Sequence, residues 1–238
     1  MTPDCLAAAM DHAGNCQPLE SCGVIADEEF IPIPNLATDP NFFVMDMRAF
    51  CRVAKDRKVT AIVHSHIHVP PIAGDADRAM CEKSGLPWVI VSWPFGTHCV
   101  IQPKGEGQPL VGRSWAWGAN DCFSLIRDGF HHYTGILIHD YDREWEFWKR
   151  KVALIENQVD ASGFVRLPPH TPPQHCDLFG MRVKSDVINH LALFLHPDKI
   201  LHQFQGKLSV RELYDGTYQS LTKLHLRHKR FVVGEQVS

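Results

Sequence analysis

Apolar residues recur at different spacings along the first hundred residues, and the changes of spacing mark alternating helices and strands. Apolar residues at helical spacing, or residues typical of helix ends, predict helices over residues 3–14, 45–58 and 75–85. Gly85 is placed to end the third of these helices. Residues 59–66 form a β-branched run without alternation, which is typical of a strand buried on both faces. Shorter apolar runs that predict further strands cover residues 21–26, 86–93 and 97–102. Strands separated by helices predict an α/β domain.

The second half of the chain has a different order, with helices first and strands after. Residues 121–135 predict a helix that opens at Asp121, and aromatic and apolar positions at three- and four-residue spacings predict another over 143–163. Residues 190–204 predict a hairpin that turns through residues 196–198, and residues 223–233 predict a final strand. This order predicts an α+β domain.

Between the halves, residues 102–114 carry three glycines and two prolines without any periodicity, which is typical of a linker. We therefore expect two domains, at residues 1–105 and 114–238, joined by a linker at 106–113. Each would have an ordinary domain size.

Composition and charge exclude several classes of protein. The formal net charge is −3, so the basic excess that is typical of nucleic-acid binders is absent. The alternating basic and apolar residues at 223–233 accordingly favour a half-exposed strand over a nucleic-acid patch. No apolar run approaches the ~20 residues that span a bilayer. The first 15 residues lack the basic region and apolar core of a secretion signal, so we expect synthesis in a cytoplasm and no export.

Three histidines, His64, His66 and His68, stand close together at the end of the predicted strand 59–66. Side chains two positions apart on a strand share a face, so His64 and His66 point the same way. Asp77 falls in the first turn of the next predicted helix. Two imidazoles and a carboxylate, with a fourth position for water, are typical of a catalytic zinc. A histidine-rich loop is the alternative, and we expect His68 to be a loop residue.

These residues resemble the JAMM (MPN+) metalloprotease family over residues 5–102. The family motif places a glutamate in a Pro-x-Glu-x-Cys-Gly context, then His-Ser-His, and an aspartate eleven positions after the second histidine. The matching residues are Pro18, Glu20, Cys22, Gly23, His64, Ser65, His66 and Asp77. The resemblance implies a mixed sheet flanked by helices, zinc (Zn2+) on His64, His66 and Asp77, and Glu20 as the general base. The family serine that helps to hold the oxyanion is replaced by Gly74, so we expect zinc binding with weakened peptidase activity.

A second candidate site begins at Cys122, which directly follows Asp121, a favoured N-cap residue. The amides and macrodipole of a helix N-terminus favour a thiolate, so Cys122 is a candidate nucleophile. His190, at the start of an apolar strand run, is the candidate base, and His202, on the next predicted strand, is the candidate orienting group. Whether His202 faces His190 depends on the hairpin register. A buried core cysteine is the alternative for Cys122.

The order of these residues resembles the NlpC-type cell-wall cysteine peptidases, which have a papain-like fold, over residues 111–235. Trp117, Gly118, Asp121 and Cys122 match the motif before the nucleophile, and Asn189 and His190 match the histidine motif. Cys176 replaces the usual glycine before Asp177, and Phe123 replaces a common serine. The resemblance implies cleavage of peptidoglycan stem peptides by Cys122, His190 and His202.

A JAMM-like domain followed by an NlpC-like domain resembles the tail tip assembly proteins of lambda-like tailed phages. That pairing implies a peptidoglycan endopeptidase that aids tail assembly or DNA entry, with other tail tip proteins and stem peptides as partners. It also implies a location in the host cytoplasm during assembly or at the virion tail tip. The alternative is a non-catalytic assembly factor that uses relic peptidase domains as interaction surfaces.

Overall fold

The structure, a computed structural model, describes residues 2–40, 42–105, 107–141 and 143–232. The chain divides into two compact units, Met1–Gly107 and Gln108–Ser238, and each unit has its own sheet. Among the described residues, no helix combines the length and the apolar character that crossing a bilayer requires.

The N-terminal unit is a five-stranded mixed sheet with helices on both faces, as the alternation of elements predicts. The strand order is β2-β1-β3-β4-β5; β3 and β4 run parallel, and the other neighbours run antiparallel. The elements are α1 (Pro3–Cys16), β1 (Cys22–Ala26), β2 (Glu29–Ile33), α2 (Met47–Asp56), β3 (Val59–Ile67), α3 (Asp75–Ser84), β4 (Trp88–Trp93) and β5 (Thr97–Ile101).

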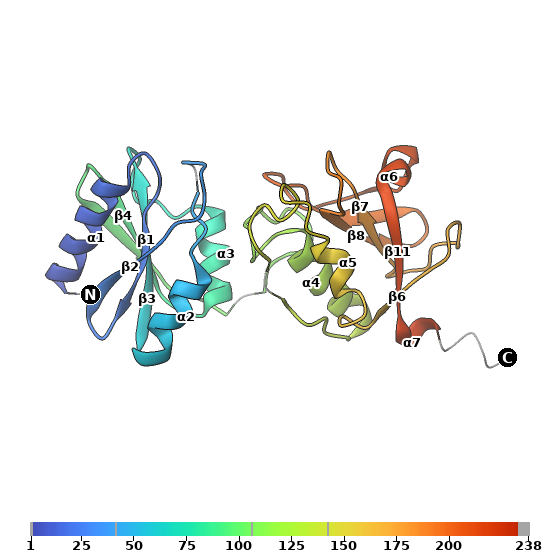
Figure 1. Cartoon of the computed structure of the whole chain (residues 1–238), viewed down its shortest axis with the longest axis horizontal. Coiled ribbons are helices and arrows are strands. Elements are labelled where there is room, and N and C mark those ends of the chain that lie inside the picture. Colours follow the sequence, from blue (N-terminus) through green and yellow to red (C-terminus); the bar gives the residue numbers. More distant parts are fainter. Residues whose placement is uncertain (1, 41, 106, 142, 233–238) are drawn as a thin grey trace. The chain divides into compact units, whose positions relative to one another are not determined.

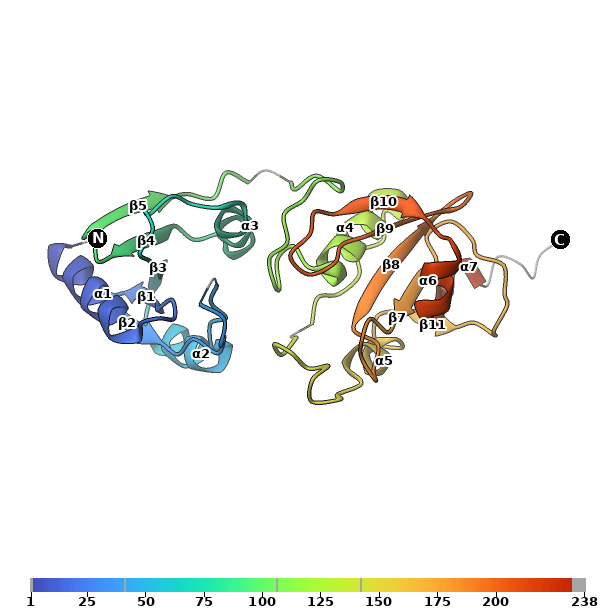
Figure 2. The same cartoon turned by 90° about the horizontal axis from the view of Figure 1, so that it is seen from above.

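Neighbouring residues of β3 pack on opposite faces of this sheet, because strand side chains alternate. Val63 belongs to a buried cluster with residues of α1. Ile62 belongs to a separate cluster that includes Ala49 of α2 and Cys81 of α3. Figures 1 and 2 show the same division, with α1 on one face of the sheet and α2 and α3 on the other. The even-numbered positions of β3 therefore face α2 and α3.

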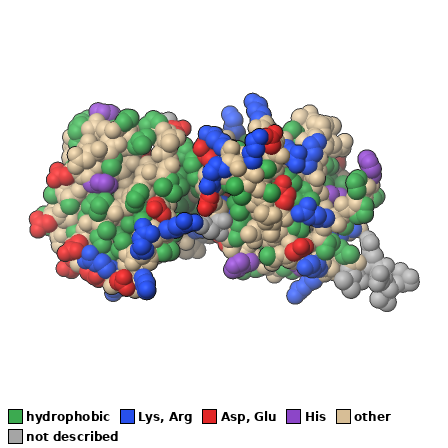
Figure 3. All heavy atoms as spheres, in the orientation of Figure 1, with side chains coloured by type: hydrophobic (Ala, Val, Ile, Leu, Met, Phe, Trp, Pro, Cys, Tyr) green, Lys and Arg blue, Asp and Glu red, His purple; other side chains and the backbone are tan. Residues whose placement is uncertain are grey.

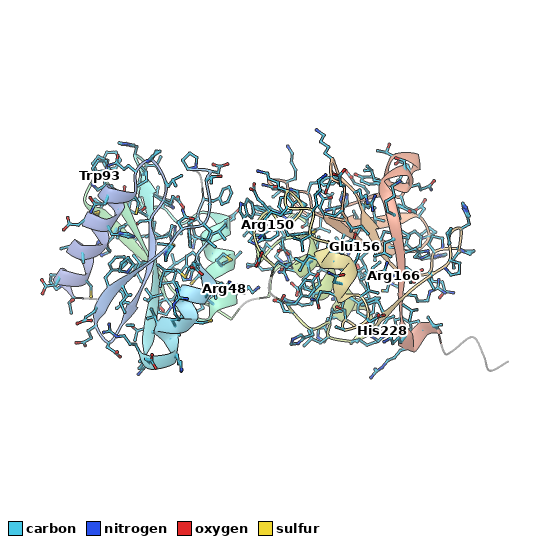
Figure 4. The ribbon with its side chains drawn as sticks, in the orientation of Figure 1. Arg48, Trp93, Arg150, Glu156, Arg166 and His228 are labelled. Carbon is cyan, nitrogen blue, oxygen red and sulfur yellow. The ribbon has the colours of Figure 1, made fainter. Side chains whose placement is uncertain are left out.

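The first helix is longer than the sequence predicts. It continues past Gly14 to Cys16, whereas we expected it to end near the glycine. A Cβ atom at Gly14 would lie 2.8 Å from Nε1 of Trp93, which is labelled at the end of β4 in Figure 4. The glycine therefore allows α1 to lie close to the sheet and does not end the helix.

The C-terminal unit is a six-stranded sheet in which every neighbouring pair is antiparallel, so the α+β prediction is confirmed. The strand order is β10-β9-β8-β7-β11-β6. The elements are α4 (Cys122–Thr134), α5 (Leu154–Gln158), β6 (Phe164–Arg166), β7 (Leu178–Met181), β8 (His190–Leu195), β9 (Lys199–His202), β10 (Val210–Leu213), α6 (Gly216–Leu221), β11 (Thr222–His228) and α7 (Lys229–Val232).

The central strand β8 is buried along its whole length between two clusters. Leu191 and Leu193 pack with residues of α4, including Ile126, in the main core. Ala192 and Phe194 lie in a second cluster on the opposite face. Burial on both faces explains why six consecutive residues of this strand are buried.

The predicted hairpin is confirmed: β8 and β9 pair antiparallel, with Leu195 opposite Lys199 and Ala192 opposite His202. This register places His202 on the same face as Ala192. Because His190 is two residues before Ala192, the two histidines are diagonal neighbours on one face.

The helix predicted over residues 143–163 is wrong. Only Leu154–Gln158 is helical, and residues 145–151 form turns in which Glu146 and Lys151 have φ angles of 55° and 56°. The aromatic spacing has another cause: Trp145 and Trp148 contact the ring of Trp117 at centroid distances of 5.1 and 5.8 Å. Aromatic residues are weak helix formers, so their packing with other rings determines the conformation here.

The prediction of one strand over residues 223–233 is correct only in its first part. The strand β11 ends at His228, and Lys229–Val232 form the short helix α7. The last residue of the predicted strand, at position 233, lies outside the described residues.

Charged side chains of both signs stand together on the face of the C-terminal unit that Figure 3 shows. The Nζ atom of Lys149 lies 2.6 Å from Oε1 of Glu146, and the Nζ atom of Lys151 lies 2.7 Å from Oδ2 of Asp186. Carboxylates therefore neutralise these two lysines at the surface.

Candidate active sites in the two units

The end of β3 and the start of α3 bring together the three predicted metal ligands. His64 and His66 share the face that α2 and α3 cover, and Asp77 lies in the first turn of α3. The Nε2 atom of His64 is 3.2 Å from Oδ1 of Asp77, and that of His66 is 3.6 Å from Oδ2. One donor atom from each residue lies within 4.8 Å of the others, so the three side chains could hold one metal ion.

The environment of His64 fits a metal ligand. Its side chain is 1% exposed, and neither ring nitrogen makes a hydrogen bond of good geometry in the described part of the chain, although Nε2 lies 3.2 Å from Oδ1 of Asp77. Phe43 stacks on the imidazole at a centroid distance of 4.9 Å, and Trp88 packs against its edge. A buried nitrogen without a partner is costly, and a metal ion would satisfy it.

His66 has the outer contact that metal-bound histidines commonly make. Its Nδ1 atom lies 3.0 Å from the carbonyl oxygen of Pro70. A hydrogen on Nδ1 would be donated to that oxygen and leave Nε2 free as a ligand atom.

Glu20 lies close enough to this cluster for its charge to interact with His66 and Asp77. Burial raises the pKa of Glu20 to about 8; His66 opposes the shift, and Asp77 adds to it. Its backbone carbonyl accepts a hydrogen bond from Nδ2 of Asn35 at 2.9 Å. The next residue, Ser21, donates its backbone N–H to Oγ of Ser65 at 2.7 Å. The bond to Ser65 fixes the Glu20 segment to the strand that carries both histidines.

Gly74 is the N-cap of α3, and its N–H donates to Oδ2 of Asp77 at 2.7 Å. Its φ angle of −74° is open to any residue, and a Cβ atom there would meet only Asp77, at 3.5 Å. The backbone therefore has room for the serine that the motif expects.

His68 is exposed and lies outside the metal cluster. Its ring packs against Trp93 at a centroid distance of 5.7 Å, which agrees with its interpretation as a loop residue.

In the C-terminal unit, Cys122 is the first residue of α4, as predicted, and Asp121 is the N-cap. The Oδ1 atom of Asp121 accepts the N–H of Ser124 at 2.8 Å, and its Oδ2 atom accepts the N–H of Gly118 at 2.9 Å. Nε of Arg143 also donates to Oδ2, at 3.1 Å. The turn before the helix is therefore held by one buried carboxylate.

The surroundings of Cys122 oppose the thiolate that the helix start favours. Burial raises the pKa of the Cys122 thiol to about 12, and the carboxylate of Asp121 adds to the shift. The backbone of Leu191 is a smaller, opposing influence. Both effects act against the helix N-terminus, because desolvation and a neighbouring anion disfavour a thiolate.

His190 and His202 are brought together, with Nε2 of His190 3.1 Å from Nδ1 of His202. Phe204 stacks on His190 at a centroid distance of 4.5 Å. Burial lowers the pKa of His190 to about 3, with a contribution from His202. Burial lowers the pKa of His202 as well, against the opposing charge of Glu212, so both rings favour the neutral form.

Cys122 and His190 are not joined by a hydrogen bond among the described residues. The sulfur approaches β8 at Leu191, on the α4 side, whereas His190 shares the opposite face with Ala192. The structure therefore does not bring Cys122 and His190 together, although catalytic hydrogen bonds often form only once substrate is bound.

Two further residues, which belong to neither motif, complete the row of histidines. Nε2 of His202 lies 3.1 Å from Oε2 of Glu212, and the hydroxyl of Tyr218 donates to the same oxygen. Glu212 lies on β10, next to β9, so the pairing of β10 with β9 was the missing signal.

Comparison with known families gives one match for each unit. Residues 2–116 match the family described as prokaryotic homologs of the JAB domain. Residues 112–227 match the NlpC/P60 family. The two matches agree with the two units and with the two candidate sites.

Two curated proteins are similar along most of the chain. Tail tip assembly protein K of Escherichia phage N15 is 34% identical over 229 residues, which cover 93% of this chain and 93% of that protein. Tail tip assembly protein K of Escherichia phage lambda is 32% identical over 176 residues, covering 72% of this chain and 83% of that protein. Among solved structures, a solution structure of a protein from Desulfitobacterium hafniense covers 42% of this chain and 78% of its own, with 23% identity and a TM-score of 0.34.

Proposed function

Because the chain belongs to the family of tail tip assembly protein K of lambda-like phages, with a JAB domain followed by an NlpC/P60 domain, we propose that it cleaves peptidoglycan stem peptides. Cys122 is the nucleophile, His190 the base and His202 its orienting group. The observation that carries the proposal is the buried His190–His202 pair at 3.1 Å, together with the approach of Cys122 to Leu191, the next residue after His190.

The reaction is an acyl transfer that starts from a neutral thiol and a neutral imidazole. His190 accepts the thiol proton while the sulfur of Cys122 attacks the amide carbon. The N–H of Cys122, one of the first amides of the helix, has no partner within the helix and suits the oxyanion. His190 then gives the proton to the leaving amine, and water hydrolyses the thioester.

The N-terminal unit is proposed to bind zinc through His64, His66 and Asp77. The bound ion would supply a Lewis acid and a water of lowered pKa. Glu20 would take and return the proton, and its position beside His66 and Asp77 supports that role. The absence of a side chain at Gly74 predicts slow peptidase chemistry in this unit.

The proposed setting is the phage tail, with other tail tip proteins as partners and the host cytoplasm or the virion tail tip as the location. The boundaries proposed for the two functional parts are residues 1–105 and 114–238. The second candidate function is a non-catalytic assembly factor, which the raised pKa of Cys122 favours because buried structural cysteines are unreactive.

Incubation of the full chain with purified peptidoglycan separates the two functions. The parent should release stem peptides, and Cys122→Ala should not. Cys51→Ala is the matched control, since Cys51 is exposed on α2 in the other unit. Equal release by parent and Cys122→Ala would refute the nucleophile, and no release by the parent would favour the assembly factor.

Metal content tests the zinc site separately. Chain purified without chelators should contain about one zinc per molecule, and His64→Ala combined with His66→Ala should remove it. His68→Ala is the matched control, because that ring lies outside the cluster. A parent chain without zinc would refute the site.

A further inference from the structure

We propose that Glu212 is a positioning residue that fixes the ring tautomers of His202 and His190 and leaves Nδ1 of His190 as the basic nitrogen. Its effect on the rate rests on the proposed cysteine peptidase function, while its effect on the tautomers does not. The geometry that carries it is the continuous row from Glu212 through His202 to His190, with two contacts of 3.1 Å.

Glu212 sets the tautomer of His202. An ionised carboxylate only accepts hydrogen bonds, so the Nε2 atom of His202 that faces Oε2 of Glu212 must carry a hydrogen. A neutral imidazole has one N–H, and burial favours the neutral form of His202. Nδ1 of His202 is therefore a bare acceptor.

His202 in turn sets the tautomer of His190. Its Nε2 atom lies 3.1 Å from the bare Nδ1 of His202 and must donate to it. The ring of His190 is also buried and neutral, so its single hydrogen stays on Nε2. Nδ1 is left without a hydrogen, as the base that takes the thiol proton must be.

The surroundings of Glu212 keep it charged and in place. The hydroxyl of Tyr218 donates to the oxygen that faces His202, and this bond is the main reason that the pKa of Glu212 is lowered. The ring of Tyr218 also packs edge-on against His202 at 5.0 Å. The Glu212 side chain is 47% exposed, so its replacement creates no cavity in the core.

The same geometry gives Glu212 a role during the reaction. When His190 holds the thiol proton, it becomes a cation that donates through Nε2 to His202. The carboxylate then stabilises this cation across one neutral ring, which is the usual function of the third member of such a row. Glu212→Gln keeps an acceptor oxygen and loses the charge, whereas Glu212→Ala loses both.

Nitrogen-15 NMR of the histidine rings in the full chain tests the inference without any substrate. Resonances of His190 and His202 are assigned by single substitution of each. In the parent, both rings should show Nε2–H with bare Nδ1. Glu212→Gln should keep this pattern, and Glu212→Ala should give a mixture of tautomers at His202. Glu144→Ala, at an exposed glutamate paired with Arg150, is the matched control and should change nothing.

Peptidoglycan cleavage supplies the second readout. Glu212→Ala should lower kcat about tenfold or more with an unchanged KM, but by less than the ~10²–10⁴ that general acid–base catalysis contributes in full. Glu212→Gln should lie between it and the parent. Unchanged tautomers in Glu212→Ala would overturn the inference. Altered tautomers in a chain that cleaves nothing would uphold it while the proposed function fails.

Discussion

The neutral state of Cys122 makes a quantitative prediction about its alkylation by iodoacetamide. Only the thiolate reacts, and a pKa of about 12 leaves ~3 × 10⁻⁵ of the thiol ionised at pH 7.5. A free cysteine with a pKa of ~8.5 is ~10% ionised at that pH. Cys122 should therefore react ~10³-fold more slowly than a free thiol, before any further loss from burial.

The assay is a pH series from 6 to 10 on the full chain, with quenching and mass spectrometry of the peptide that contains Cys122. The peptide that contains the exposed Cys51 reports on the reagent in the same tube. The rate at Cys122 should rise about tenfold per pH unit across the series, because the thiol stays far below half-ionisation. A rate that is high and constant between pH 6 and 8 would contradict this prediction, because it would reveal a thiolate paired with a protonated His190.

Three more predictions concern folding and the N-terminal site. Asp177→Ala should reduce the free energy of unfolding by about 3–5 kcal/mol in urea denaturation, because it leaves the buried Arg227, bonded at 2.9 Å, without its anion. Burial would raise the pKa of Asp177, but its hydrogen bonds with His225 and Arg227 lower it. This stabilisation should therefore be complete above pH ~4 and lost as the pH falls through the pKa of the folded state. If the free energy of unfolding of Asp177→Asn fell in the same way at low pH, the result would contradict this. Gly74→Ser should raise any peptidase activity of the N-terminal unit, by up to ~10²–10³, while it changes stability by less than about 1 kcal/mol; a fast parent that the serine leaves unchanged would disprove the weakened catalyst. A chain of residues 108–238 should be soluble and fold alone, as circular dichroism would show; an insoluble fragment would contradict separate folding.

The N-terminal site was predictable because each of its parts depends on local rules. Two residues of separation place His64 and His66 on one face of any strand. The start of a helix places Asp77 at the same end of the unit, and the structure brings the three within ligand distance. The contact between Ser21 and Ser65 that fixes Glu20 was not predictable, because it depends on the pairing of β1 with β3.

The C-terminal site was predictable only in part. The positions of Cys122 and the hairpin follow from capping and apolar patterns, but the ionisation of Cys122 depends on what buries it. Glu212 has no motif and is recruited by strand pairing. The helix predicted over 143–163 failed because period alone does not distinguish a helical stripe from tryptophans that pack with one another across turns.

The loop of residues 196–198 between β8 and β9 limits how this unit can change by insertion and deletion. The pairing of Leu195 with Lys199 sets the register that puts His202 beside His190. If one added residue shifted that pairing by one position, it would turn His202 to the opposite face, toward the α4 core, while leaving every amino acid of both strands unaltered. Active descendants of this sequence should therefore accept changes of length in exposed loops elsewhere and keep this loop at its present length.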